Sequence, residues 1–146
     1  MDADLSVKLD VYRSTAERGR VPTLGEVADR TGLSRTDVRD AFARIAARRL
    51  LVLDPGGETI LMAPPFSGVP TQHVVESGGI EYFANCAWDA LAIPAALHRP
   101  GEVRSRCEQS GDPLRLGVGI DGPEPSDWLF HCEVPAARWW TDIVYT

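Results

Sequence analysis

Apolar residues in the first part of the chain fall in runs separated by turn signals. The run over residues 5–17 contains no glycine or proline, which favours a helix that Gly19 ends. Thr23 and Glu26 have the spacing of a capping box, so they predict the start of a second helix. Gly32 supplies the tight turn that ends this second helix.

The next run carries the clearest helical stripe, and Ser34 is placed to cap it. Its apolar residues recur at i, i+3, i+4, i+7 and i+8, namely Val38, Ala41, Phe42, Ile45 and Ala46. Residues 50–53 and 59–62 then predict two strands joined by a turn over residues 54–57. Three helices followed by a hairpin are typical of a winged helix, so we expect residues 1–62 to form a winged helix-turn-helix-like domain.

Residues 63–70 form a proline-rich stretch that predicts an extended linker, because proline excludes helix and restrains the residue before it. Beyond the linker, alternation predicts strands at residues 71–76, 80–83, 102–107, 114–120 and 128–134, and residues 136–146 indicate a short helix. A helix of almost uncharged residues begins near Ala84, and we expect Pro94 to break or kink it. The sequence therefore predicts an α+β fold. In it, the N-terminal winged-helix-like module packs on a small mixed or antiparallel β-sheet domain, residues 71–146, with a central cysteine-bearing helix.

Composition adds a charge pattern that bears on partners. The net charge is −6, and residues 1–60 hold ten basic and ten acidic residues, so residues 61–146 carry the whole excess. This balance argues against a general nucleic-acid binder. The third helix does present arginines that can meet phosphates, so a winged-helix transcriptional regulator stays as an alternative. These arginines are Arg35, Arg39, Arg44, Arg48 and Arg49.

Three cysteines, Cys86, Cys107 and Cys132, have no spacing typical of a metal finger. The N-terminus shows no secretory signal, and no run of about 20 apolar residues predicts a transmembrane helix. We therefore expect free thiols and a cytoplasmic setting.

The candidate chemistry lies at the start of the central helix. With Asn85 as the N-cap, Cys86 and Asp89 are three positions apart and share one face. The positive end of the helix dipole favours the Cys86 thiolate. A soft nucleophile beside a carboxylate predicts a reactive site. The alternative is a small cysteine that packs like an alanine, with an aspartate at the surface.

The run Tyr82–Leu97, which reads YFANCAWDALAIPAAL, resembles the signature of the alkylmercury (organomercurial) lyases. The linker Met62–Pro70, Cys107 with the following Gly111–Leu114, and Val134–Thr146 are also similar to that family. The resemblance covers nearly the whole chain. It implies cleavage of carbon–mercury bonds by protonolysis, which gives a hydrocarbon and Hg(II).

The resemblance also implies roles for individual residues. Cys86 matches the first catalytic cysteine, and Asp89 matches the aspartate that shuttles the proton; both would contact mercury. The family's second catalytic cysteine follows the motif that here reads Asp142–Thr146, where this chain ends. We therefore expect capture of the organomercurial without turnover, or slow turnover, unless Cys132 supplies the second thiolate. A buried structural thiol is the competing interpretation of Cys132, and Cys107 is expected in the core or a turn.

The resemblance implies no organic cofactor. Hg(II) would be the bound product, cellular thiols the co-reactant, and a thiol carrier or mercuric reductase the recipient of the metal. Neither a nucleic acid nor a membrane is an expected partner. The alternatives are a non-catalytic metal- or electrophile-binding protein and the winged-helix regulator.

Overall fold

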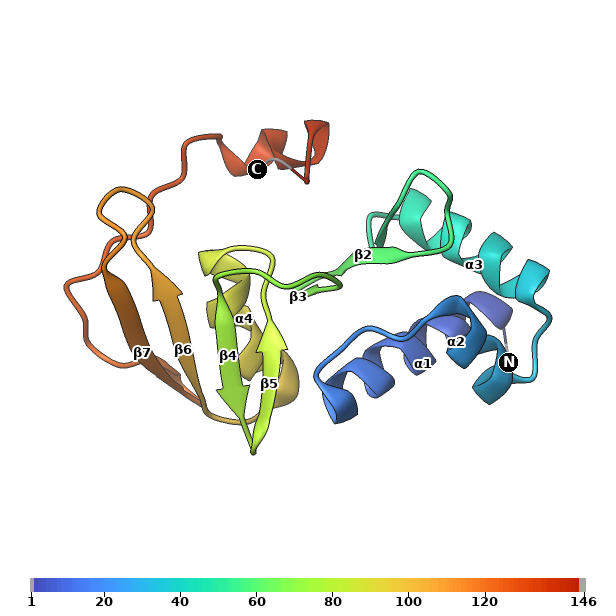
Figure 1. Cartoon of the computed structure of the whole chain (residues 1–146), viewed down its shortest axis with the longest axis horizontal. Helices are drawn as coiled ribbons and strands as arrows, with labels where there is room; N and C mark the ends of the chain where they lie inside the picture. The colour runs from blue at the N-terminus through green and yellow to red at the C-terminus, as the bar shows by residue number, and fades with distance from the viewer. Residues whose placement is uncertain (1, 145–146) are drawn as a thin grey trace.

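The structure, a computed structural model, describes residues 2–144. Its elements in chain order are α1 (Ala3–Arg18), α2 (Leu24–Thr31), α3 (Arg35–Ala47), β1 (Val52–Leu53), β2 (Ile60–Ala63), β3 (Phe66–Ser67), β4 (Val74–Ser77), β5 (Ile80–Phe83), α4 (Ala87–Leu97), β6 (Gly101–Arg106), β7 (Pro113–Gly119), β8 (Gly122–Pro123) and a 3₁₀ helix η1 (Ala136–Thr141). Helices α1–α3 lie at one end of an elongated molecule and the sheet containing β4–β7 at the other (Figure 1).

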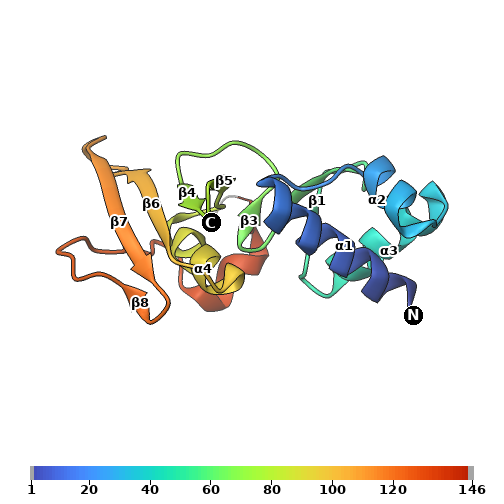
Figure 2. The same cartoon turned by 90° about the horizontal axis from the view of Figure 1, so that it is seen from below.

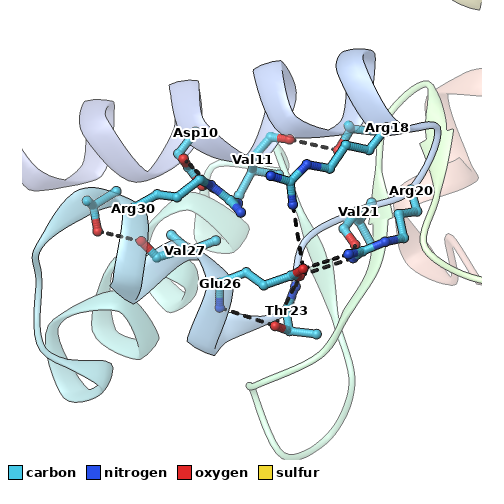
Figure 3. A network of polar contacts seen from close by, with 11 residues as sticks. Asp10, Val11, Arg18, Arg20, Val21, Thr23, Glu26, Val27 and Arg30 are labelled. Atoms are coloured by element: carbon cyan, nitrogen blue, oxygen red, sulfur yellow. Dashed lines mark hydrogen bonds and ion pairs between the residues drawn. The ribbon is translucent and has the colours of Figure 1, made fainter.

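Local capping chemistry sets the helices of the N-terminal end. The Thr23 hydroxyl accepts from the Glu26 amide at 3.2 Å, and the Glu26 carboxylate accepts from the Thr23 amide at 2.8 Å, which confirms the capping box. Arg18 and Arg20 both reach the Glu26 carboxylate, at 3.7 and 2.6 Å (Figure 3). These contacts fix the turn between α1 and α2.

The helices α1–α3 enclose the first of two hydrophobic cores. The stripe predicted on α3 faces this core, where Val38, Ala41 and Phe42 are fully buried. Strands β1 and β2 pair antiparallel, with Val52 opposite Met62, and close the core on one side. The three predicted helices and the hairpin are therefore present.

Strands β4–β8 form the second sheet, which has the order β5-β4-β6-β7-β8 and antiparallel pairing throughout. Helix α4 crosses one face of this sheet and packs on β4, β6 and β7 (Figure 1). Val75, Tyr82, Ala90 and Ile93 are buried in the core between helix and sheet. This packing fixes α4, the helix that follows Cys86.

Two tyrosines hold α1 against the second half of the chain. The Tyr12 hydroxyl donates to the carbonyls of Leu50, at 3.0 Å, and Pro64, at 3.2 Å, and its ring contacts both cores. The Tyr82 hydroxyl donates to the Ala16 carbonyl at 2.6 Å. The N-terminal helices therefore form one wall of the region around α4.

Several sequence predictions of structure are wrong. The linker contains a strand, β3, which pairs with β2. Residues 128–134 form no strand: they follow β8, the last strand of the sheet, and pair with none of its strands. Helix α4 continues through Pro94 to Leu97 and is not broken there, and its Trp88 is 53% exposed although the helix is almost uncharged.

The C-terminal segment crosses back over the molecule instead. Figures 1 and 2 show η1 lying near α4 and the strands β2 and β3, far from the end of β7 that precedes it in the chain. The Arg49 guanidinium lies over the ring of Trp140 at 5.7 Å, and this contact joins η1 to the end of α3. The family motif that the sequence predicts at Asp142–Thr146 ends at a residue that lies outside the described part of the chain.

Among the residues that are described, no helix has the length and apolar character needed to cross a membrane.

Candidate active site

The candidate site forms where strand β5 leads into α4. Ala84 bridges to Phe66, and the chain then reaches Cys86, which is the N-cap of α4 with extended backbone angles (φ −151°, ψ 179°). The N-cap prediction for Asn85 is therefore wrong by one residue. The Cys86 side chain makes no capping hydrogen bond, so the first amides of α4 remain directed at the region of its sulfur.

Cys86 is half-buried, and burial is the main reason that the pKa of its thiol is raised above the ordinary value. The backbone amides of Asp89 and Trp88 lower this pKa, as the helix dipole predicts, but they do not approach Sγ in ordinary hydrogen-bond geometry. The negative charge of Asp89 raises it further. The effect expected of the helix start, which favours the thiolate, is thus outweighed by burial, which favours the protonated thiol.

Asp89 lies in the first turn of α4, and burial also raises the pKa of its carboxyl. Asn85 opposes this shift, because its Nδ2 donates to Oδ2 of Asp89 at 3.0 Å. Asp89 also faces α1. The pKa of Tyr12 is raised to about 12, first by burial and then by the charge of Asp89.

Asn85 ties this carboxyl to the linker. Its Nδ2 also donates to the carbonyls of Pro65 and Phe66, each at 3.3 Å, while its Oδ1 is buried with no partner among the residues described. This contact between Asn85 and Asp89 is not among those predicted from the sequence. The i, i+4 spacing of the two residues was a usable signal.

Trp88 and Phe130 form the outer edge of the site, with ring centroids 5.7 Å apart. This contact brings the segment that carries Cys132 towards α4, and the charge of Cys132 raises the pKa of Cys86. Cys132 itself is exposed, and its Sγ donates to the Val134 carbonyl at 2.8 Å. The interpretation of Cys132 as a buried structural thiol is therefore wrong.

Cys107 does not join the site. It follows β6 at a turn, where its amide donates to the Asp112 carbonyl at 2.9 Å and its carbonyl accepts from Gly111 at 2.8 Å. The pKa of its thiol is lowered, mainly by a hydrogen bond with the Ser110 side chain. The expectation of a position in the core or a turn is confirmed as a turn.

Two surface hollows lie outside the Cys86–Asp89 pair. One, of about 420 Å³, lies between α1 and α2, and the other, of about 360 Å³, is lined by Tyr12, Pro65 and Phe66 among others. Neither hollow is lined by Cys86 or Asp89.

Within residues 2–144, no three His, Cys, Asp or Glu side chains group as ligands for a metal ion. The chemistry available at this site is thus that of one thiol, one carboxyl and their amide partner.

Comparison of the sequence with known proteins identifies one family. The model of the alkylmercury lyase family matches residues 66–146. An alkylmercury lyase from Streptomyces lividans is 34% identical over 104 residues, which are 71% of this chain and 46% of that protein. One from Bacillus cereus is 27% identical over 120 residues, 80% of this chain and 53% of that protein.

A solved structure supports the fold. The mercury-bound form of MerB2 superposes with a TM-score of 0.62 at 22% identity, over 86% of this chain and 65% of that chain. The chain thus spans about half the length of the curated relatives it matches.

Proposed function

The chain belongs to the alkylmercury lyase family, and from this membership and the site we propose that it cleaves carbon–mercury bonds of organomercurials by protonolysis. The observation that carries the proposal is the pair of half-buried groups, Cys86 and Asp89, on one turn of α4. Burial makes both groups hold protons more firmly than they do in water. A thiol that captures mercury and a carboxyl that carries its proton are what protonolysis requires.

The first step is capture. The Cys86 S–H bond breaks and its proton passes to the Asp89 carboxylate, while Sγ forms a bond to mercury and the ligand opposite the carbon, a thiolate or halide, leaves as an anion. Sulfur is favoured over the oxygen and nitrogen ligands of the site because mercury is soft. The raised pKa of the Asp89 carboxyl favours its protonated form, so it retains the proton for the next step.

The second step is protonolysis. The Asp89 O–H bond breaks, a C–H bond forms with the electron pair of the C–Hg bond, and the hydrocarbon leaves. Hg(II) stays on the Cys86 thiolate with the Asp89 carboxylate beside it. A second thiolate raises electron density on mercury and on the carbon, so it accelerates this step.

We propose Cys132 as one source of the second thiolate, and a cellular thiol as the other. The contact between Phe130 and Trp88 and the effect of the Cys132 charge on Cys86 support Cys132. Its exposure leaves it free to approach a bound metal. Cellular thiols would then carry Hg(II) away to a thiol carrier or mercuric reductase, in the cytoplasm, without an organic cofactor.

We also propose the division into a winged-helix-like domain (1–62), a linker (63–70) and a lyase-like domain (71–146). Internal contacts of the arginines support a structural role for the first domain over DNA binding. Arg44 makes a bidentate contact to Asp4 at 2.7 and 2.9 Å, and Arg49 stacks on Trp140. Arg39 pairs with Glu58 at 3.4 Å. Arginines held in this way are less available to phosphates than the sequence suggests.

Benzene release from phenylmercury tests the proposal. The chain is incubated with phenylmercury and excess thiol, and benzene is followed by gas chromatography beside Cys86→Ser and Asp89→Asn. We expect benzene from the unmodified chain, a bound phenylmercury adduct without benzene in Asp89→Asn, and neither in Cys86→Ser. Binding of phenylmercury with no benzene from the unmodified chain would favour the non-catalytic metal-binding alternative.

A further inference from the structure

Asn85 makes contacts that a capping or packing residue does not need. Its single amide nitrogen faces three acceptors, the carbonyls of Pro65 and Phe66 and the carboxylate oxygen Oδ2 of Asp89, and the contact to Asp89 is the shortest at 3.0 Å. Three acceptors fix the orientation of the amide, because the flipped form would set Oδ1 against three oxygens. The linker therefore holds Asn85, and Asn85 holds Asp89.

The consequence is that the two oxygens of Asp89 are not equivalent. Oδ2 receives the Asn85 N–H, while Oδ1 receives no hydrogen bond from residues 2–144. A lone pair that accepts a hydrogen bond is less available to a proton, so the transferable proton is directed to Oδ1. The remaining charged or titratable neighbours are Cys86 at the start of α4, with Cys132 beside it, and Tyr12 from α1. Tyr12 directs its hydroxyl at two backbone carbonyls and does not compete for Asp89.

We propose that Asn85 is a positioning residue for proton delivery, which sets the rotamer of Asp89 and leaves Oδ1 as the oxygen that protonates the substrate carbon. This assignment rests on the proposed lyase function. It concerns the second step, since the proton that Cys86 loses in capture can pass to either oxygen of the carboxyl or to water, whereas protonolysis needs the proton on the oxygen that faces the carbon. Small misplacements of a reacting group lower rates by about 100-fold, so the orientation of Asp89 has a measurable effect.

Single-turnover kinetics separate the two steps. Phenylmercury is mixed with excess protein, the adduct is followed by intact mass, and benzene is followed in the same samples. Asn85→Leu keeps the size of the side chain and removes the amide. We expect its capture rate to stay within about twofold and its benzene release to fall about 10- to 100-fold.

Thr71→Val is the matched control. The Thr71 hydroxyl donates to the Ala84 carbonyl at 2.6 Å, next to Asn85, but forms no hydrogen bond with Cys86 or Asp89. We expect its ratio of release to capture to equal that of the unmodified chain. Equal loss of both steps in Asn85→Leu, or unchanged release, would overturn the positioning role. No benzene from the unmodified chain would overturn the lyase function and this role with it.

A readout that does not depend on activity accompanies the kinetics. Asn85 is the one asparagine of the chain, so ¹⁵N-asparagine labelling gives a single side-chain amide pair by NMR. We expect Asp89→Leu to move this pair and Thr71→Val to leave it in place. An amide pair that does not respond to Asp89→Leu would show that the contact is absent, whatever the enzyme does.

Discussion

Both halves of the molecule have a buried core, but they differ in how their helices begin and in the apolar side chains that they leave exposed. In the N-terminal half, the core residues Val7, Val11 and Phe42 are fully buried, and α2 begins at a side-chain cap. In the C-terminal half, α4 begins at a cysteine that makes no cap, and Asp89 is partly buried in its first turn. Large apolar side chains remain exposed there, Leu129 at 93% and Trp88 at 53%.

This difference separates stability from chemistry. Fully buried apolar groups and capped helices stabilise a fold, whereas a buried carboxyl and an uncapped helix start lower its stability. Such departures from good local structure are concentrated at functional sites. The comparison therefore supports the proposal that the start of α4 is the reactive part of the chain, and the following variants test it.

The largest effect on stability is expected in the first core. Phe42→Ala removes a fully buried ring, so we expect the free energy of unfolding to fall by about 3–5 kcal/mol. Leu129→Ala, at an exposed position, should change it by less than about 0.5 kcal/mol. Urea unfolding followed by circular dichroism measures both. Similar losses from the two variants would remove the contrast between the halves.

A smaller effect separates the two helix starts. Thr23→Ala removes a side-chain cap and should lower the free energy of unfolding by about 1 kcal/mol. Cys86→Ala removes no cap, so we expect a change of less than about 0.5 kcal/mol in the same urea experiment. A loss in Cys86→Ala as large as that in Thr23→Ala would identify Cys86 as a structural residue.

The smallest effect depends on pH. Because the pKa of Asp89 is higher in the folded chain than in the unfolded one, the folded state binds more protons between the two values. Stability is therefore greatest below the unfolded pKa and falls as pH rises through the folded one. Asp89→Asn removes this loss, so its melting temperature should exceed that of the unmodified chain at pH 7. The difference should fade on acidification, and an opposite trend would show that Asp89 is stabilised as a carboxylate.

The sequence predicts the parts of the structure that depend on neighbours along the chain. The capping box at Thr23, the stripe on α3 and the placement of Cys86 and Asp89 on one turn all follow from local spacing. The contacts of Asn85 do not, because its acceptors in the linker lie about twenty residues away. Family resemblance supplied the function, because spacing alone favoured a packed cysteine over a reactive one.

Two incorrect predictions, the strand at residues 128–134 and the favoured thiolate of Cys86, have the same physical origin. Both depend on residues that are distant in the sequence. Alternation over residues 128–134 predicts a strand, but a strand also needs another strand to pair with, and only the tertiary fold determines whether one lies beside it. The pKa of Cys86 likewise depends on burial by residues distant in sequence, which outweighs the local helix amides.

The most direct test of the account asks which of the three thiols carries the mercury. The Asp89→Asn variant, which should retain the phenyl group, is treated with one equivalent of phenylmercury, digested and mapped by mass spectrometry. We predict the adduct on Cys86, although Cys132 is exposed and the pKa of Cys107 is lowered. An adduct on Cys107 or Cys132 with Cys86 free would contradict the account.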